Sequence, residues 1–206
     1  LTGMQIGQMV SKHWVEGLNQ QIFGTDSTKT LSKNDMLAGF VAGVKNDTTK
    51  MTMQFAQVYS QSSVEKIKEK ATIEKYADNK EAGEKFLAEN KSKDGVQTTE
   101  SGLQYKIITA GKGEVPTSSS RVKVNYKGTL IDGTEFESSY KRNEPTTFRA
   151  DQVIKGWTEA LTMMPVGSKW ELYIPQDLAY GSRDSGQIKP FSALVFEVEL
   201  IEIEKD

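Results

Sequence analysis

Cysteine is absent from this chain of 206 residues, and histidine occurs once, at His13. The lack of cysteine excludes disulfides, thiol nucleophiles and thiolate metal sites. A single histidine cannot form a histidine-rich metal cage, and a Ser-His-Asp triad would have to draw its histidine from the N-terminal helical region. We interpret His13 as a solvated or packed helix residue. Metal and thiol chemistry are therefore not expected.

Long apolar runs and an excess of charge of one sign are also missing. No run approaches the roughly 20 apolar residues that span a bilayer. The 26 basic and 28 acidic side chains leave a formal net charge of −2, so no overall field attracts nucleic acid or an anionic membrane. We expect no transmembrane segment and no nucleic-acid partner.

The start of the chain and its composition carry an expectation about location. The chain begins at Leu1 rather than methionine, which indicates that a leader or tag has been removed. A composition without cysteine fits an oxidising compartment. These observations favour the periplasm or cell envelope of a bacterium. The cytoplasm is the alternative, because absent cysteine fits that compartment too.

Proline is missing from residues 1 to about 92, and all five prolines follow that stretch. Because proline is confined to helix ends, edges and turns, this asymmetry separates a helical half from a half built of strands and turns. The polar stretch "NKSKDGVQTTESG" lies between the two halves. We place the boundary near residue 95.

The first half opens with two short helical patterns that are rich in apolar residues. One is "MQIGQMVSKHW", and the other is "LSKNDMLAGFVAGV", for which Ser32 is the expected N-cap and Asp35 stands three residues on. Two such helices cannot bury their apolar faces on each other completely. Residues 1–50 are therefore predicted to form a helical dimerisation domain.

Residues 51–94 follow as one long, highly charged helical pattern without a breaking residue. About 40 residues at 1.5 Å each would make a rod of roughly 60 Å. A polar helix of this length usually bridges domains in solvent, so we predict a connecting helix. A coiled coil is the rival interpretation, although no strict heptad pattern is sustained.

The second half alternates apolar and polar residues with a period of two, as in "RVKVNYKGTLI" and "ALVFEVELIEIE". The sequence "DGT" after Ile131 indicates a tight hairpin turn. The one convincing helix is short, begins near Val153 and ends before Pro165. This predicts an α+β fold in which an antiparallel sheet packs on a small helix.

Conventional catalytic sets are missing from this half. No pair of its acidic residues has a diagnostic spacing, which leaves a glycosidase without support. There is no Walker A sequence and no dinucleotide fingerprint, and "GKG" at 111–113 is interpreted as a loop. Two aromatic residues are unusually placed, since Tyr180 lies in a long loop and Trp157 at a helix start. Such positions face a cleft more readily than a strand interior does.

Several segments in consistent order carry a family resemblance. They are "VKVNYKGTLIDGTEFESSYKRNEP", "QVIKGWTEAL", "MPVGSKWELYIP", "LAYG" and "ALVFEVEL". Over residues 100 to 203 the chain resembles the FKBP-type peptidyl-prolyl cis-trans isomerases. The helical first half is similar to the bacterial dimeric subgroup of Mip-like and FKBP22-like proteins.

The resemblance implies an FKBP-type isomerase domain at 95–206, with five or six antiparallel strands wrapped around the short helix. It also implies a shallow apolar pocket for proline and no cofactor. Carried over by motif, the expected catalytic residues are Tyr126, Phe136, Glu137, Trp157, Tyr180 and Phe196. The expected substrate-binding residues are Val153, Ile154, Ile188 and Arg142.

The expected partners also follow from the resemblance. They are proline-containing unfolded or nascent proteins, rapamycin-like macrolide inhibitors and a second copy bound through the N-terminal helices. The alternative function is an FKBP-fold chaperone or binding module without significant isomerase activity. Three positions depart from the common family pattern: Glu137 replaces aspartate, Lys189 replaces a proline, and Thr146 stands where a larger apolar residue is usual. These changes put substrate preference and macrolide affinity in question.

Overall fold

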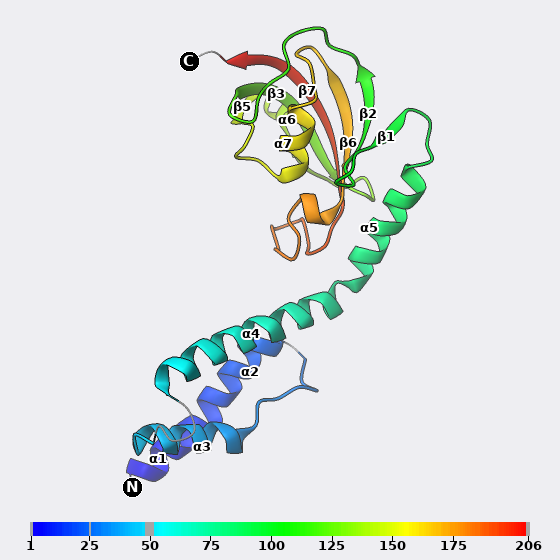
Figure 1. The fold of residues 1–206 in the computed structure, drawn as a ribbon. Coiled ribbons are helices and arrows are strands. Elements are labelled where there is room, and N and C mark those ends of the chain that lie inside the picture. Colours follow the sequence, from blue (N-terminus) through cyan, green and yellow to red (C-terminus); the bar gives the residue numbers. More distant parts are fainter. Residues whose placement is uncertain (1, 25, 48–51, 205–206) are drawn as a thin grey trace. The chain divides into compact units, whose positions relative to one another are not determined.

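The computed structural model describes residues 2–24, 26–47 and 52–204. By its internal contacts the chain divides into two compact units, Leu1–Glu74 and Lys75–Asp206, and each is described by itself. Figure 1 labels most elements of both units.

The N-terminal unit is entirely helical. Its elements are α1 (Thr2–Met9), a π-helical stretch (Val10–Trp14), α2 (Val15–Phe23), α3 (Lys33–Val44) and α4 (Met53–Lys75). The Oγ atom of Ser32 accepts a hydrogen bond from the Asp35 N–H at 3.2 Å. The predicted N-cap of α3 is therefore confirmed.

The helices of this unit leave much of their apolar surface uncovered, as the sequence predicts. Val15 and Ile22 of α2 are buried, whereas α3 has no buried residue among those described. Met4 is 74% exposed and Val44 is 72% exposed. A single copy of the unit therefore presents apolar faces to solvent.

The prediction of one uninterrupted helix is wrong, because the helical run is broken at Tyr76. Helix α4 ends at Lys75 and α5 spans Ala77–Asn90. Tyr76 has φ −116° and ψ 23°, outside the helical region. The predicted boundary between residues 50 and 51 lies outside the described residues, and the limits 1–50, 51–94 and 95–206 stay a prediction.

Helix α5 belongs to the C-terminal unit through specific contacts. The buried Asn90 donates from Nδ2 to Gln104 Oε1 at 3.0 Å, and Gln104 donates to the Leu87 carbonyl at 2.8 Å. The ring of Phe86 lies 6.2 Å from that of Tyr173. The helix that starts after the break is thus held on the sheet by long-range contacts, which the local helical pattern does not encode.

The C-terminal unit is a curved antiparallel sheet with a short helix across it. The strands are β1 (Val96–Thr98), β2 (Gln104–Thr109), β3 (Arg121–Leu130), β4 (Glu135–Ser138), β5 (Thr146–Arg149), β6 (Lys169–Ile174) and β7 (Leu194–Glu204). The order is β1-β2-β6-β7-β3-β4, and β5 also pairs with β3. The described sheet thus has seven strands, whereas the family resemblance implied five or six. The short strand β1 extends one edge of the sheet, and the short strands β4 and β5 both pair with β3.

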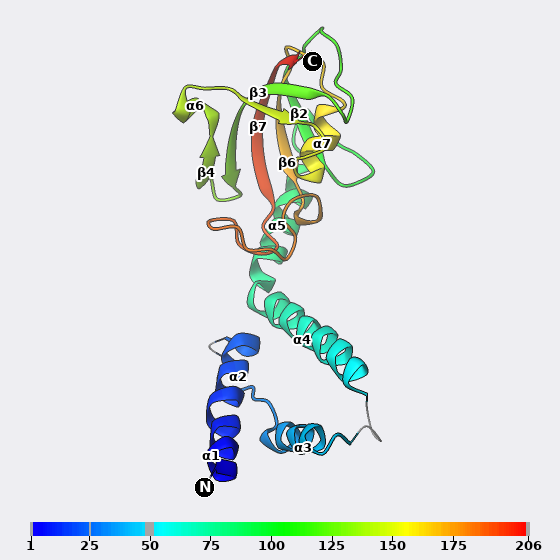
Figure 2. The same ribbon diagram turned by 90° about the vertical axis from the view of Figure 1, so that its left-hand side faces the viewer.

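The predicted short helix is present as α7, and the structure adds a second short helix and a 3₁₀ turn that the sequence patterns did not indicate. Helix α6 spans Ser139–Arg142, α7 spans Lys155–Leu161 and a 3₁₀ turn spans Gln176–Leu178. The predicted hairpin joins β3 to β4, where Gly133 has φ +87° and Asp132 Oδ1 accepts from the Thr134 N–H at 2.8 Å. The α+β fold is confirmed. Figure 2 shows α7 on one side of the curved strands.

The core lies between α7 and the sheet. A Cβ added at Gly156 would stand 2.6 Å from Cγ2 of Ile174, so only glycine allows α7 to approach β6 this closely. The buried cluster includes Leu103, Val122, Val124, Trp157, Leu161, Met164, Leu172, Ile174, Leu194, Phe196, Val198 and Leu200. Trp157 therefore belongs to one continuous core.

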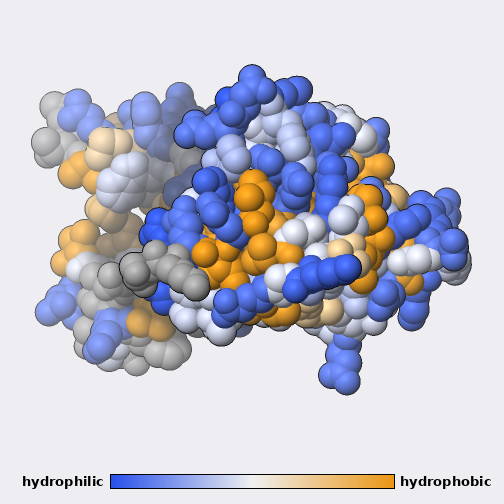
Figure 3. Space-filling view, turned by 90° about the horizontal axis from the view of Figure 1, so that it is seen from above, coloured by the Kyte–Doolittle hydropathy of each residue, from blue (hydrophilic) through white to orange (hydrophobic). Residues whose placement is uncertain are grey.

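The surface is mixed in character. Figure 3 shows apolar areas lying between hydrophilic side chains on one face of the molecule. Within the described residues, no helix is both long enough and apolar enough to cross a membrane.

Candidate active site

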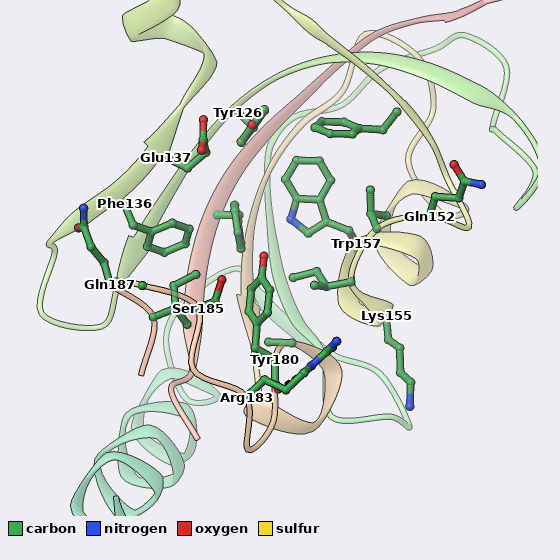
Figure 4. A pocket seen from close by; sticks show the side chains of 17 residues that line it. Tyr126, Phe136, Glu137, Gln152, Lys155, Trp157, Tyr180, Arg183, Ser185 and Gln187 are labelled. Atoms are coloured by element: carbon green, nitrogen blue, oxygen red, sulfur yellow. Dashed lines mark hydrogen bonds between the residues drawn. The ribbon is translucent and has the colours of Figure 1, made fainter. Parts of the chain in front are cut away.

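A pocket of about 790 Å³ opens between α7, the sheet and the loop that follows the 3₁₀ turn. Helix α7 and the residues before it supply Val153, Ile154 and Trp157, and the loop supplies Tyr180 and Ile188. Figure 4 shows these elements converging around the pocket. Its position agrees with the general preference of ligands for concave, mostly apolar sites.

The base of the pocket is a set of aromatic rings packed edge to face. The indole of Trp157 lies 5.2 Å from the Tyr126 ring, 5.7 Å from Phe148 and 5.2 Å from Phe196, with interplanar angles of 84° to 86°. Phe136 meets Phe196 at 5.5 Å and 83°. Edge-to-face contacts stabilise defined ring orientations, so the base is a shaped apolar surface.

Gly128 of β3 makes this arrangement possible. It is paired with Glu137 on β4 and with Phe196 on β7. A Cβ at this position would lie 2.6 Å from Cε1 of Phe196 and 2.7 Å from Cε2 of Phe136. The missing side chain of Gly128 therefore lets both rings close over the strand.

The backbone N–H of Ile154 and the hydroxyl of Tyr180 are donors at the pocket that no described residue uses. Ile154 precedes α7 in an extended conformation, and its carbonyl accepts from the Trp157 and Thr158 N–H groups. Its own N–H, like the hydroxyl of Tyr180, has no hydrogen-bond partner within the described part of the chain. Both groups are available to carbonyl oxygens of a bound peptide.

A charged pair stands at the edge formed by β4 and α6. Arg142 of α6 donates to Glu137, and it also donates to the Tyr126 hydroxyl at 3.3 Å and to Thr146 Oγ1 at 3.1 Å. The hydrogen bonds to Tyr126 and Glu137 raise the pKa of Arg142. The guanidinium therefore orients the Tyr126 side of the pocket and neutralises Glu137.

The indole N–H of Trp157 is buried without a hydrogen-bond partner among the described residues. An unpartnered buried donor costs about 1 to 3 kcal/mol. Trp170, which lies outside the pocket wall, shares this feature, so the unpartnered N–H is a property of both buried indoles and not of the pocket alone.

Two family models match the chain. The model of the FKBP-type peptidyl-prolyl cis-trans isomerase matches residues 112–201, and the model of the domain amino terminal to such isomerases matches residues 1–107. The chain belongs to the FKBP-type peptidyl-prolyl cis-trans isomerase family. The aromatic residues that surround Trp157 all lie within residues 112–201, the range matched by the isomerase model.

Two of the relatives of this isomerase match nearly all of it, and a third matches about two thirds. It is 43% identical to the FKBP-type 22 kDa peptidyl-prolyl cis-trans isomerase of Escherichia coli K12, over 98% of this chain and 91% of the relative. It is 42% identical to FkpA of Aeromonas hydrophila, over 99% of this chain and 76% of the relative. The outer membrane protein MIP of Legionella longbeachae is 53% identical over 64% of this chain and 57% of its own length.

Solved structures agree with the fold of this isomerase. The crystal structure of Escherichia coli FkpA matches with a TM-score of 0.64 and 36% identity, over 98% of this chain and 95% of that one. A peptidyl-prolyl cis-trans isomerase from Pseudomonas syringae matches with a TM-score of 0.59 and 43% identity, over 63% of this chain and 96% of that one.

The structure brings nine of the ten expected site residues of this isomerase into one pocket wall. They are Tyr126, Phe136, Glu137, Val153, Ile154, Trp157, Tyr180, Ile188 and Phe196. Arg142 does not line the pocket, which differs from its expected contact with substrate. Its guanidinium is engaged by Glu137, Tyr126 and Thr146 instead, so we assign it a positioning role.

Other lining residues were missed by the sequence reasoning. They are Phe148, Gln152, Lys155, Ala179, Arg183, Ser185, Gly186 and Gln187. A signal for most of them was present, because Gln152 and Lys155 stand inside "QVIKGW", and residues 183–187 share a loop with Tyr180. Phe148 lies on β5, and only its pairing with β3 brings it beside Trp157.

Proposed function

We propose that this FKBP-type isomerase speeds the cis-trans exchange of Xaa-Pro bonds by holding the prolyl ring against Trp157. The surrounding rings of Tyr126, Phe136 and Phe196 exclude water from the reacting amide. The Ile154 N–H and the Tyr180 hydroxyl hold neighbouring carbonyl oxygens. The single observation that carries this proposal is an apolar, ring-lined pocket with two unused donors at its wall.

The chemistry needs positioning and desolvation rather than proton transfer. An Xaa-Pro bond exchanges through a twisted state in which amide resonance is lost, against a barrier near 20 kcal/mol. The planar amide has a larger dipole than the twisted one, so a water-poor pocket favours the twisted state. A barrier lower by about 7 kcal/mol corresponds to a rate increase of roughly 10⁵-fold.

The test is cis-trans exchange of a neutral Leu-Pro tetrapeptide, followed by NMR exchange spectroscopy. The intact chain is compared with Phe136→Ala and with Tyr105→Ala. Tyr105 is the matched control, because it is a partly buried ring stacked on Trp170 at 4.6 Å and does not line the pocket. Loss of exchange in Phe136→Ala alone supports the proposal. Equal loss in both variants, or none in the intact chain, overturns it.

In the second part of the proposal, two chains pair through the N-terminal unit and hold one client protein between them. Support comes from the exposed apolar faces of α1 and α3 and from the match to the amino-terminal domain of this family. Two linked pockets raise the effective concentration of the second binding event. Unfolded or nascent proteins with proline are the clients that this arrangement fits.

The proposed location is the periplasm or cell envelope. It is supported by the absence of cysteine and by the printed name of one relative, an outer membrane protein. Rapamycin-like macrolides are the proposed inhibitors, because the family resemblance implies them and the base of the pocket around Trp157 is apolar. Quenching of tryptophan fluorescence by rapamycin, lost in Phe136→Ala, is the expected result.

A further inference from the structure

The charged groups around the pocket are unevenly distributed. Glu137 is the one acidic residue in the described pocket wall, and Lys155 and Arg183 are its two basic residues. Figure 4 shows Glu137 on one side of the opening, with Lys155 and Arg183 on the other, the side of Tyr180. The two cations therefore share one part of the rim.

Two acidic residues that adjoin the pocket wall in the sequence are already paired with other cations. Asp184 pairs with Lys189 at 3.1 Å, and Asp151 pairs with Arg149 at 2.9 Å. Glu159, one helical turn beyond Lys155, keeps its charge, but its carboxylate accepts a hydrogen bond from Ser101 Oγ at 2.6 Å and is not paired with Lys155. Within residues 52–204, neither Lys155 nor Arg183 forms an ion pair.

Arg183 is also held in place at the rim. Its backbone N–H donates to the Tyr180 carbonyl at 3.1 Å, and its Nε lies 3.5 Å from the same oxygen. Arg183 is exposed, and no described residue bonds to the terminal nitrogens of its guanidinium. They are suited to a carboxylate, because the planar guanidinium presents two parallel N–H groups.

We propose that Lys155 and Arg183 select peptides with an acidic side chain close to the proline. This inference rests on the proposed isomerase function and names the substrate class that the same pocket prefers. The prolyl ring occupies the apolar base, and a flanking aspartate or glutamate reaches the cationic rim. At the other end, Arg142 neutralises Glu137, so no acidic group in the wall offsets this attraction.

The experiment uses hexapeptides with blocked, uncharged ends and a central Leu-Pro pair. The two residues before this pair and the two after it are varied one at a time, and each is set in turn to Glu, Gln or Lys. Exchange catalysed by the intact chain is measured by NMR at low salt and at about 0.5 M salt. At one or more positions kcat/KM should fall in the order Glu, Gln, Lys. For each cation that contacts the acid, kcat/KM for the Glu peptide should exceed that for the Gln peptide by about twofold to fivefold, the size expected for an exposed ion pair.

Charge reversal tests which residues are responsible. Arg183→Glu and Lys155→Glu should each reduce the Glu-to-Gln ratio, and the double variant should invert it. Lys112→Glu is the matched control, since this exposed lysine lies outside the pocket wall, and it should leave the ratio unchanged. High salt should shrink the preference of the intact chain, because it screens exposed charges.

The outcomes separate the two proposals. If the intact chain fails to accelerate the neutral Gln peptides, the isomerase proposal itself fails. If it accelerates them but shows no acidic preference at any position, only the charge inference is overturned. The charge inference is also overturned if the double variant still unfolds cooperatively and keeps the preference for the Glu peptide. In that case a group other than Lys155 and Arg183 binds the acidic side chain.

Discussion

The indole of Trp157 and the ring of Phe196 meet edge to face, with centroids 5.2 Å apart and planes inclined at 84°. One ring comes from α7 and the other from β7, so the contact joins the helix to the centre of the sheet. The same indole also meets Tyr126 and Phe148. The rings at the base of the pocket are therefore part of the close-packed core, which holds them in fixed positions.

Gly128→Ala is expected to disturb this base directly. The new Cβ would collide with Phe136 and Phe196 at 2.6 to 2.7 Å, and overpacking of this kind costs about 1 to 3 kcal/mol of stability. Displaced rings should lower kcat/KM by about tenfold or more. Exchange measured well below the melting temperature checks this, and unchanged activity would show that ring position matters little.

Glu137→Ala should reduce turnover without unfolding the domain. The change releases Arg142, which otherwise links Glu137 to the Tyr126 hydroxyl, and we expect a loss of up to about tenfold in kcat/KM. Glu135→Ala is the matched control, because Glu135 pairs with Lys141 on the same strand and helix but does not line the pocket. Loss of cooperative melting in Glu137→Ala would count against the positioning role.

Catalysis should be nearly independent of pH between 6 and 8. The described pocket wall contains no histidine, the side chain whose ordinary pKa lies in this range. The pKa of Arg142 is raised by its bonds to Tyr126 and Glu137, so the guanidinium stays protonated as pH rises through this window. A bell-shaped profile of kcat/KM would instead indicate proton transfer.

Charges placed on the exposed apolar faces should separate the paired chains. The double variant Met4→Asp, Val44→Asp changes two side chains that are 74% and 72% exposed. The stability of a single copy should therefore change little. Sedimentation should show a dimer for the intact chain and a monomer for this variant. Val115→Asp in the C-terminal unit, where Val115 is 42% exposed, serves as the control.

The consequence for clients is measured with the same double variant. Exchange of the neutral tetrapeptide should be unchanged, because each pocket is complete within one chain. Catalysis of a proline-limited refolding reaction should weaken, since two-point binding is lost. A monomeric variant that assists refolding as well as the dimer would contradict a role for pairing.

Local patterns in the sequence were sufficient for several elements. Ser32 caps α3, Asp132 and Gly133 form the hairpin turn, and the short helix lies between Val153 and Pro165. Each depends on interactions between residues a few positions apart. The motifs around Trp157 and Tyr180 likewise pointed to residues that the structure gathers in one pocket wall.

Only the tertiary structure decided the features that depend on distant partners. The break at Tyr76 accompanies contacts of α5 with Gln104 and Tyr173. The cationic rim arises because a loop places Arg183 on the same side as Lys155. Helix and strand periodicity, helix caps and turns depend on residues that are close together in the sequence. The packing of α5 after the break at Tyr76, like the cationic rim, depends on contacts between segments far apart in the sequence, which no local pattern indicates. By itself the sequence determined the family and the chemistry of the pocket, and packing determined which side chains surround it.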